Sequence, residues 1–264
     1  MCYDRFMSLP ELVTPLKRQT LSGDVYVQLR ELLMSGHMMP GEQISLRSTA
    51  AALGVSVMPV REAVHRLVAE QALELTPNRA LRVPIMSVSQ FREITSIRIN
   101  LEGLATEQAA GHLGDAAIQQ IGALHERFAE EMARPKPDCS RLIAVNKELH
   151  FAVYKGAGMP ILLQMIEALW LRIGPILNHD LRSGSRRVGE QVAVNHHARL
   201  VAALKRKDGG AARAALRGDI ESAAEYIVSA GVLLAADALD EPVPGAGKPA
   251  SKTARRAGGG RKTA

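Results

Sequence analysis

Apolar residues recur every three or four positions through most of the chain, the spacing that gives an α-helix one buried face. Between residues 87 and 240 this pattern is rich in Ala and Leu, and no convincing strand alternation interrupts it. We therefore expect an all-helical bundle of about six helices there. The expected breaks fall near Leu113, at Pro135-Lys136-Pro137, before Pro160, at Pro175 (a kink or an end) and at Asp208-Gly209-Gly210, and the last helix is expected to end near Ala236.

Residues 21–86 contain shorter elements separated by turn signals. A first amphipathic helix ends near Gly36, an Ala-rich helix covers residues 48–53, and a third helix follows the turn at Gly54. Ser56 is placed to cap this third helix, and Pro59 falls in its first turn, where a missing N–H costs little. Alternating segments at residues 73–75 and 81–83 predict a β-hairpin. The expected fold class is therefore mainly α, a winged helix-turn-helix domain followed by an all-helical bundle.

Four arginines and one serine occupy positions where a winged helix meets DNA. The N-terminal end of the third helix enters the major groove in this fold, and Arg61 projects there opposite the apolar face. Ser56 stands at the helix N-terminus, where the dipole favours a phosphate. Arg47 precedes the Ala-rich helix, and Arg79 and Arg82 lie at the tip and return strand of the hairpin. Each residue alone is equally well explained as a cap or a solvated side chain, but their combined order favours DNA binding.

Composition narrows the class of protein. Hydrophobic residues make up 47% of the chain and aromatic residues only 3%, which suits Ala/Leu-rich helices better than a β-sandwich. The two cysteines, Cys2 and Cys139, do not amount to a disulfide framework and favour a cytoplasmic location. We find no signal-peptide pattern and no apolar run of membrane-spanning length, so we expect no membrane partner.

The net charge of +6 arises at the C-terminal end. After Glu241 there are six bases and no acid, so residues 1–241 carry equal numbers of bases and acids. We expect residues 241–264 to form a disordered basic tail and residues 1–20 to form a partly ordered arm. Such a tail is typical of a polyanion-binding segment, although a purely solubilising role explains it equally well.

A second candidate site comes from polar residues on inward helix faces. Asn146 and His150 are one turn apart and share a face with apolar neighbours, and His197 and Asp219 lie on the inward stripes of later helices. Imidazole and carboxylate together suit a divalent metal ion. The alternative is that these are core residues whose polar atoms are satisfied by hydrogen bonds. The spacing alone favours this alternative, because the chain has no tight local ligand motif.

The segment Gly54-Val55-Ser56 followed by Pro59-Val60-Arg61-Glu62-Ala63 resembles the DNA-binding domain of the GntR family of bacterial transcription regulators. The resemblance covers the whole of residues 21–86 and implies that the residues singled out above, together with Pro59, contact a double-stranded DNA operator. Two positions depart from the family pattern. Val57 stands where the family often has Arg, and Arg79 stands where the wing tip often has Gly.

The helical part resembles the FCD effector domain of the FadR-like branch of that family, whose pattern is Asp or Asn, three residues, His, and two further histidines. Asn146, His150 and His197 match it, whereas Asp219 stands where the family usually has His. The resemblance implies one divalent metal ion, with zinc, nickel, manganese and magnesium all open. A carboxylate at Asp219 moves the preference toward harder ions.

Arg98 also matches a position common in that family, at the start of the first effector helix, with Glu102 one turn later. The resemblance implies that this pair lines the effector cavity. The alternative is an intrahelical ion pair of minor energetic weight.

The sequence therefore predicts a cytoplasmic, ligand-responsive transcription regulator that acts as a homodimer and whose effector is a small organic acid, most simply a carboxylate. Its expected domains are residues 1–20 (arm), 21–86 (DNA binding), 87–240 (effector binding and dimerisation) and 241–264 (tail). The alternative is a metal-dependent enzyme that uses His150, His197 and Asp219. The chain has no HExxH motif and no Gly-rich phosphate loop, which counts against an enzyme.

Overall fold

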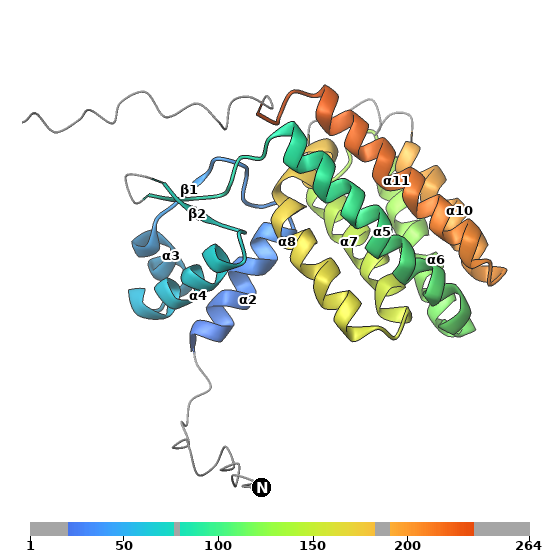
Figure 1. The fold of residues 1–264 in the computed structure, drawn as a ribbon, viewed down its shortest axis with the longest axis horizontal. Helices are drawn as coiled ribbons and strands as arrows, with labels where there is room; N and C mark the ends of the chain where they lie inside the picture. Colours follow the sequence, from blue (N-terminus) through green and yellow to red (C-terminus); the bar gives the residue numbers. More distant parts are fainter. Residues whose placement is uncertain (1–20, 77–79, 183–190, 235–264) are drawn as a thin grey trace, which may run out of the picture.

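The computed structural model describes residues 21–76, 80–182 and 191–234. A small unit with a three-stranded sheet adjoins a larger group of long helices (Figure 1). The fold is mainly α, as predicted. The predicted N-terminal arm, the predicted basic tail and the wing tip with Arg79 lie outside the described residues.

The N-terminal unit groups three helices, α2 (Leu21–Met34), α3 (Leu46–Leu53) and α4 (Val57–Ala69). Ser45 caps α3 because its side chain accepts a hydrogen bond from the Ser48 amide at 3.3 Å, so α3 begins two residues earlier than predicted. Gly54 ends α3 with a φ of 66°, in the left-handed region that glycine enters without strain. This turn allows α4 to pack against both α2 and α3.

The sheet consists of β1 (Gln43–Ile44), β2 (Glu74–Leu75) and β3 (Leu81–Arg82), with β3 in the centre and antiparallel to both neighbours. The predicted hairpin is confirmed as the pair β2–β3. The strand β1 escaped prediction because it is only 2 residues long, too short to show an alternating pattern.

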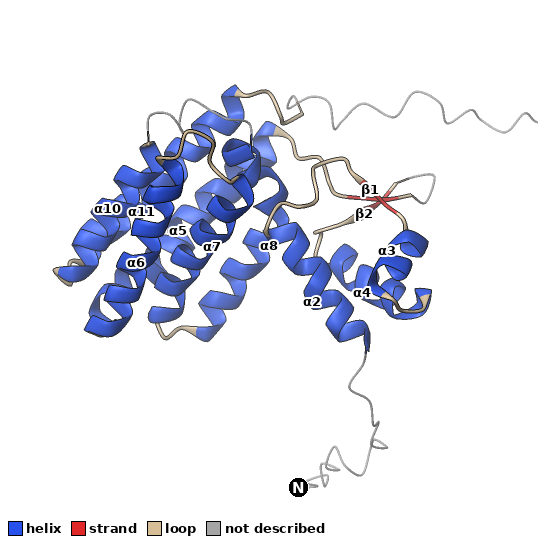
Figure 2. Cartoon of the chain, turned by 180° about the vertical axis from the view of Figure 1, so that it is seen from behind, coloured by secondary structure: helices blue, strands red, loops and turns tan. Residues whose placement is uncertain are grey.

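The larger unit contains long helices that lie side by side next to the winged unit (Figure 2). The helix α5 is central, because it packs against α7, α8, α10 and α11. It begins with a complete capping box, in which Ser87 and Gln90 satisfy each other's backbone amides. The described helices are α5 (Val88–His112), α6 (Asp115–Met132), α7 (Cys139–Gly156), α8 (Pro160–Arg182), α10 (Val192–Lys205) and α11 (Gly209–Ser229).

The structure decides one boundary that the sequence left open and corrects another. Of the two outcomes expected at Pro175, a kink or an end, the end is excluded because α8 continues to Arg182. Burial of Ile173 and Ile176 on either side of the proline offsets the lost hydrogen bond. The helix α11 ends at Ser229 rather than near Ala236. Gly231 then turns the chain with a φ of 69°, which brings Leu234 beside the start of α5.

The helix α8 also corrects the expectation that no apolar run is long enough to cross a membrane. Its residues Pro160–Leu177 meet that requirement by length and composition. Within this window Leu162, Ile166 and Trp170 are buried against the other helices. One face of this apolar helix therefore lies in the core.

The two units meet where α2 packs against α8. At Gly174 of α8, an added Cβ atom would lie 2.8 Å from the carbonyl oxygen of Leu33 and 2.9 Å from the Cα atom of Met34. Only glycine permits this close approach of the two backbones. The C-terminal end of α2 is thus held directly against a helix of the larger unit.

Candidate functional site

The N-terminal end of α4 presents its polar residues to solvent. Val60 and Val64 are buried beneath it, whereas Arg61 is exposed on the opposite side, as predicted from the periodicity. Ser56 occupies the N-cap position, but its side chain forms no capping hydrogen bond, which corrects the predicted capping role. Its exposed hydroxyl thus remains available to an outside partner, as do the backbone amides of the first turn.

The remaining candidate DNA contacts differ in their surroundings. Arg47 is exposed near the start of α3, and Pro59 is partly buried in the first turn of α4. Arg82 on β3 forms an ion pair with Glu74 on the neighbouring strand β2. Arg82 therefore has a partner within the wing and would have to exchange it to reach a phosphate.

A buried charged network runs through the centre of the helical unit. Arg98 and Glu102, one turn apart on α5, are 4% and 0% exposed. The Nε of Arg98 donates to Glu102 Oε1 at 2.6 Å, and the guanidinium also stacks 5.2 Å from the centre of the Trp170 ring. An ion pair without access to water has a large desolvation cost and strong internal attraction. The two residues therefore form the intrahelical ion pair of the alternative prediction, and this pair is buried rather than solvated.

Tyr154 joins this ion pair to the histidines. Its hydroxyl donates a hydrogen bond to Glu102 Oε2, and its oxygen lies 3.1 Å from Nδ1 of His150. Because the single phenolic proton is used on Glu102, the hydrogen in the second contact belongs to His150 Nδ1. A neutral His150 therefore carries its lone pair on Nε2.

The lone pair of His150 faces a carboxylate. His150 Nε2 and His197 Nε2 lie 3.4 Å and 3.7 Å from Oδ2 of Asp219. One donor atom from each residue lies within 4.8 Å of the others, and the residues come from three helices, α7, α10 and α11. An acceptor nitrogen facing an acceptor oxygen is unfavourable unless a proton or a cation lies between them.

The protonation states suit a cation. Burial by itself raises the pKa of the Asp219 carboxyl, but His150 and His197, acting as hydrogen-bond donors and positive charges, outweigh it and hold that pKa well below its usual range. A divalent ion would supply this positive charge in place of the ring protons. Burial lowers the pKa of His197. Among the described residues neither of its ring nitrogens has a partner within hydrogen-bond distance, since Oδ2 of Asp219 lies 3.7 Å from Nε2. Neutral imidazoles and an ionised carboxylate are the forms that bind metal ions. The donor set and the unsatisfied His197 nitrogens thus fit a divalent ion.

The structure brings two groups of predicted residues together. Arg98 lies beside Glu102, and His150 and His197 lie beside Asp219. Asn146 is half-buried on α7, one turn before His150. Tyr154 and Trp170 belong to the same network but were not predicted. Tyr154 is four residues after His150 on the same face, a spacing that could have revealed it. Trp170 gave no usable signal, because a buried aromatic residue is ordinary in any core.

Comparisons with known proteins agree with this architecture. Residues 21–83 match the model of bacterial regulatory proteins of the gntR family, and residues 93–222 match the FCD domain. The chain is 35% identical to the HTH-type transcriptional regulator McbR of Escherichia coli over 193 residues, which cover 73% of this chain and 86% of McbR.

Two solved structures show the same fold. The structure of E. coli McbR/YncC superimposes with a TM-score of 0.73 at 30% identity, covering 81% of this chain and 99% of that one. A GntR-type regulator from Rhodococcus sp. RHA1 gives a TM-score of 0.64 at 19% identity, covering 79% and 98%. Because these relatives are regulators, the alternative of a metal-dependent enzyme is not supported.

The burial of Arg98 and Glu102 leads to a stability prediction with an internal control. Glu102→Ala leaves a buried guanidinium without its partner, so we expect a loss of about 3–5 kcal/mol in the free energy of unfolding. Arg217 and Glu221 form an ion pair of the same spacing on the surface of α11. Glu221→Ala should therefore cost about 0.5 kcal/mol or less. Urea denaturation measures both, and equal losses would contradict the assigned role of burial.

Proposed function

The chain belongs to the gntR family of bacterial regulatory proteins and carries an FCD effector-binding domain, and we propose that it is a homodimeric regulator whose operator affinity responds to a small organic acid. The acid binds through a divalent ion held by His150, His197 and Asp219, with Asn146 as a fourth ligand. The observation that carries this proposal is the convergence of two imidazoles and a carboxylate in a buried cluster.

The charge of the buried cluster supports an acidic effector. Arg98 contributes one positive charge, and Glu102 and Asp219 contribute one negative charge each, so the cluster has a net charge of −1 when the histidines are neutral. A divalent ion changes this sum to +1. In a buried setting this sign decides whether an anion is attracted or repelled. The ion would thus supply a binding partner for a carboxylate, and Arg98 and Glu102 would line the effector site.

The exposed end of α4 supports the assignment of DNA contacts. We propose that Arg61 reads base edges while Ser56 and the first-turn amides, positioned by Pro59, bind a phosphate. Arg47 and Arg82 would contact the backbone beside the groove, together with Arg79. In this proposal residues 21–86 bind DNA, and residues 87–240 bind the effector and form the dimer. Because the partner is bacterial DNA, we expect the protein in the cytoplasm.

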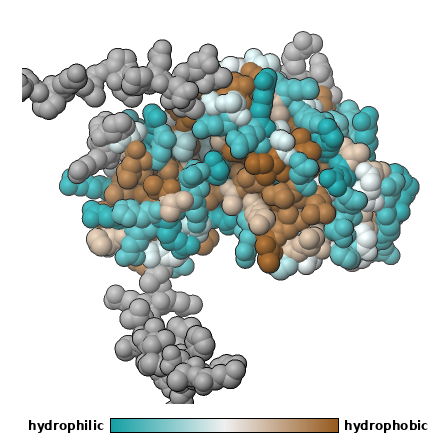
Figure 3. Space-filling view, viewed as in Figure 1, coloured by the Kyte–Doolittle hydropathy of each residue, from teal (hydrophilic) through white to brown (hydrophobic). Residues whose placement is uncertain are grey.

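An exposed apolar surface supports the homodimer. Ile161 and Met165, one turn apart on α8, are 71% and 52% exposed, and Ile97 on α5 is 39% exposed. Figure 3 shows a broad hydrophobic area over α8 and the adjoining part of α5. Large apolar surfaces of this kind usually mark an interface. A two-fold axis through it would place one winged unit on each side, which suits an operator with two half-sites.

Arg61→Ala should weaken binding to an operator duplex selected from a random library, because a good bidentate base contact is worth about 1–3 kcal/mol. Arg199→Ala, at an exposed position on α10, is the matched control. Gel-shift titration compares the two variants. A change of less than about twofold for Arg61→Ala, roughly 0.4 kcal/mol, would show that α4 does not read the bases.

His150→Ala and His197→Ala should each abolish the rise in melting temperature that zinc gives the wild-type protein. A ligand present at a hundred times its dissociation constant stabilises the folded state by about 2.7 kcal/mol. Asp219→His should keep a metal and shift selectivity toward zinc or nickel, because it adds a nitrogen ligand. Melting curves with and without chelator, combined with elemental analysis, test this. A melting temperature insensitive to metal in the wild-type protein would reduce the cluster to a structural role.

Ile161→Glu should convert the dimer to a monomer, because it introduces a charge into an apolar contact. It should weaken operator binding in parallel, since a monomer contacts one half-site. Val27→Glu places the same charge on another exposed apolar residue, 63% exposed on α2, and should leave the dimer intact. Sedimentation velocity reports the mass of each variant. A dimeric Ile161→Glu protein would place the interface elsewhere.

A further inference from the structure

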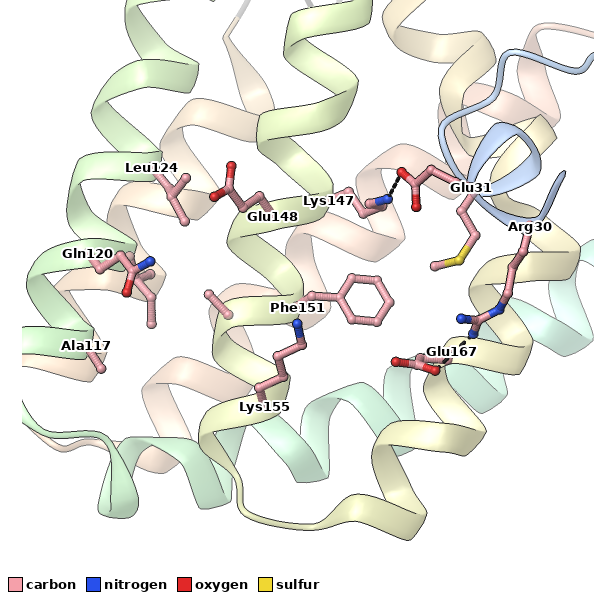
Figure 4. A pocket seen from close by; sticks show the side chains of 13 residues that line it. Arg30, Glu31, Ala117, Gln120, Leu124, Lys147, Glu148, Phe151, Lys155 and Glu167 are labelled. Atoms are coloured by element: carbon pink, nitrogen blue, oxygen red, sulfur yellow. Dashed lines mark hydrogen bonds and ion pairs between the residues drawn. The ribbon is translucent and has the colours of Figure 1, made fainter. Parts of the chain in front are cut away.

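We propose that the cleft between α2 and the helices α6, α7 and α8 binds a small amphipathic organic anion, as a second ligand site separate from the histidine cluster. The cleft has a volume of about 550 Å³ and is lined by residues of both units (Figure 4). This volume lies in the range of sites for small organic ligands. The proposal goes beyond the proposed function, which places its effector at the buried metal ligands.

The ion pairs around the cleft leave one of its three lining cations without an acid. Arg30 on α2 pairs with Glu167 on α8 at 2.9 Å, and Lys147 on α7 pairs with Glu31 on α2. The third acid of the lining, Glu148, faces Arg127 at 3.8 Å. Lys155, the remaining lining cation, is exposed and has no acidic partner among the residues that the structure describes. A ligand that complements this cleft therefore carries a negative group for Lys155.

Most of the remaining lining is apolar, so the uncharged part of the ligand should be apolar as well. Phe151 lies one turn before Lys155 on α7, and both side chains point into the cleft (Figure 4). Ile121 and Leu124 of α6 and Met34 of α2 complete the apolar surface. A carboxylate or sulfonate on an aromatic or aliphatic body would match both parts, with its body against Phe151 and its charge at Lys155.

The position of the cleft gives such a ligand an effect on the DNA-binding unit. Arg30 and Lys147 make the ion pairs that join α2 to α8 and α7, and an anion in the cleft would compete with Glu31 and Glu167 for them. Both pairs are partly solvated, so they are weak and readily exchanged. An occupied cleft would therefore shift the orientation of α2.

The probe is 8-anilinonaphthalene-1-sulfonate, which combines an aromatic body with one sulfonate and fluoresces when it leaves water. We expect the full-length protein to bind one molecule per chain in a saturable titration. Lys155→Gln should weaken this binding about fivefold, which corresponds to a loss of about 1 kcal/mol. Lys205→Gln, at an exposed position on α10 away from the cleft, should leave it unchanged.

A second variant tests the location by shape. Gln120 lines the cleft from an exposed position on α6, so Gln120→Trp should fill the mouth and abolish saturable binding without disturbing the core. Binding should persist in excess chelator, which separates this site from the metal cluster. Equal affinities in Lys155→Gln and Lys205→Gln, unchanged binding in Gln120→Trp, or loss of binding on chelation would each overturn the proposal.

Discussion

The structure depends on a charged pair that has been taken out of water. Arg98 and Glu102 lie at the centre of the helical unit with almost no exposure, and such a pair is stable only when its remaining hydrogen-bonding capacity is satisfied. Tyr154 supplies the missing donor to Glu102, and Trp170 covers the guanidinium. The pair thus determines which residues must surround it, and through Tyr154 it also fixes the proton on His150. A buried ion pair stabilises a fold little, so its proposed value here is the orientation of the candidate metal site.

The helices α7 and α8 contribute residues both to the buried cluster and to the contacts with α2 of the DNA-binding unit. On α7, Lys147 contacts α2 and lies one turn before His150. On α8, Glu167 contacts α2 and lies one turn before Trp170. If a ligand at the proposed site rotated or shifted either helix, the movement would act directly on Arg30 and Glu31. This arrangement gives a physical basis for coupling between effector and operator, since the two sites share rigid elements.

The helices, the hairpin and the inward histidines could be predicted, because they depend on periodicity and turn residues within one segment. The interactions that connect segments could not. Lys147 was visible in the sequence as a polar residue on α7, but its partner Glu31 is 116 positions away, and nothing local indicates the pairing. The burial of Arg98 and Glu102 was similarly hidden, because an Arg–Glu pair at this spacing usually lies on a helix surface. At Pro175 the sequence left a kink or an end of α8 open, because the packing that carries the helix through the proline involves other segments.

The central claim is that the network from Arg98 to Tyr154 orients His150 for a metal ion. The most direct test is the zinc affinity of Tyr154→Phe, which removes one oxygen and leaves the shape of the core intact. Loss of a group that orients a ligand typically costs about 10–100-fold in metal affinity. We predict a loss of that size, with no change for Tyr226→Phe on α11. A wild-type zinc affinity in Tyr154→Phe would contradict the account and show that the network only fills the core.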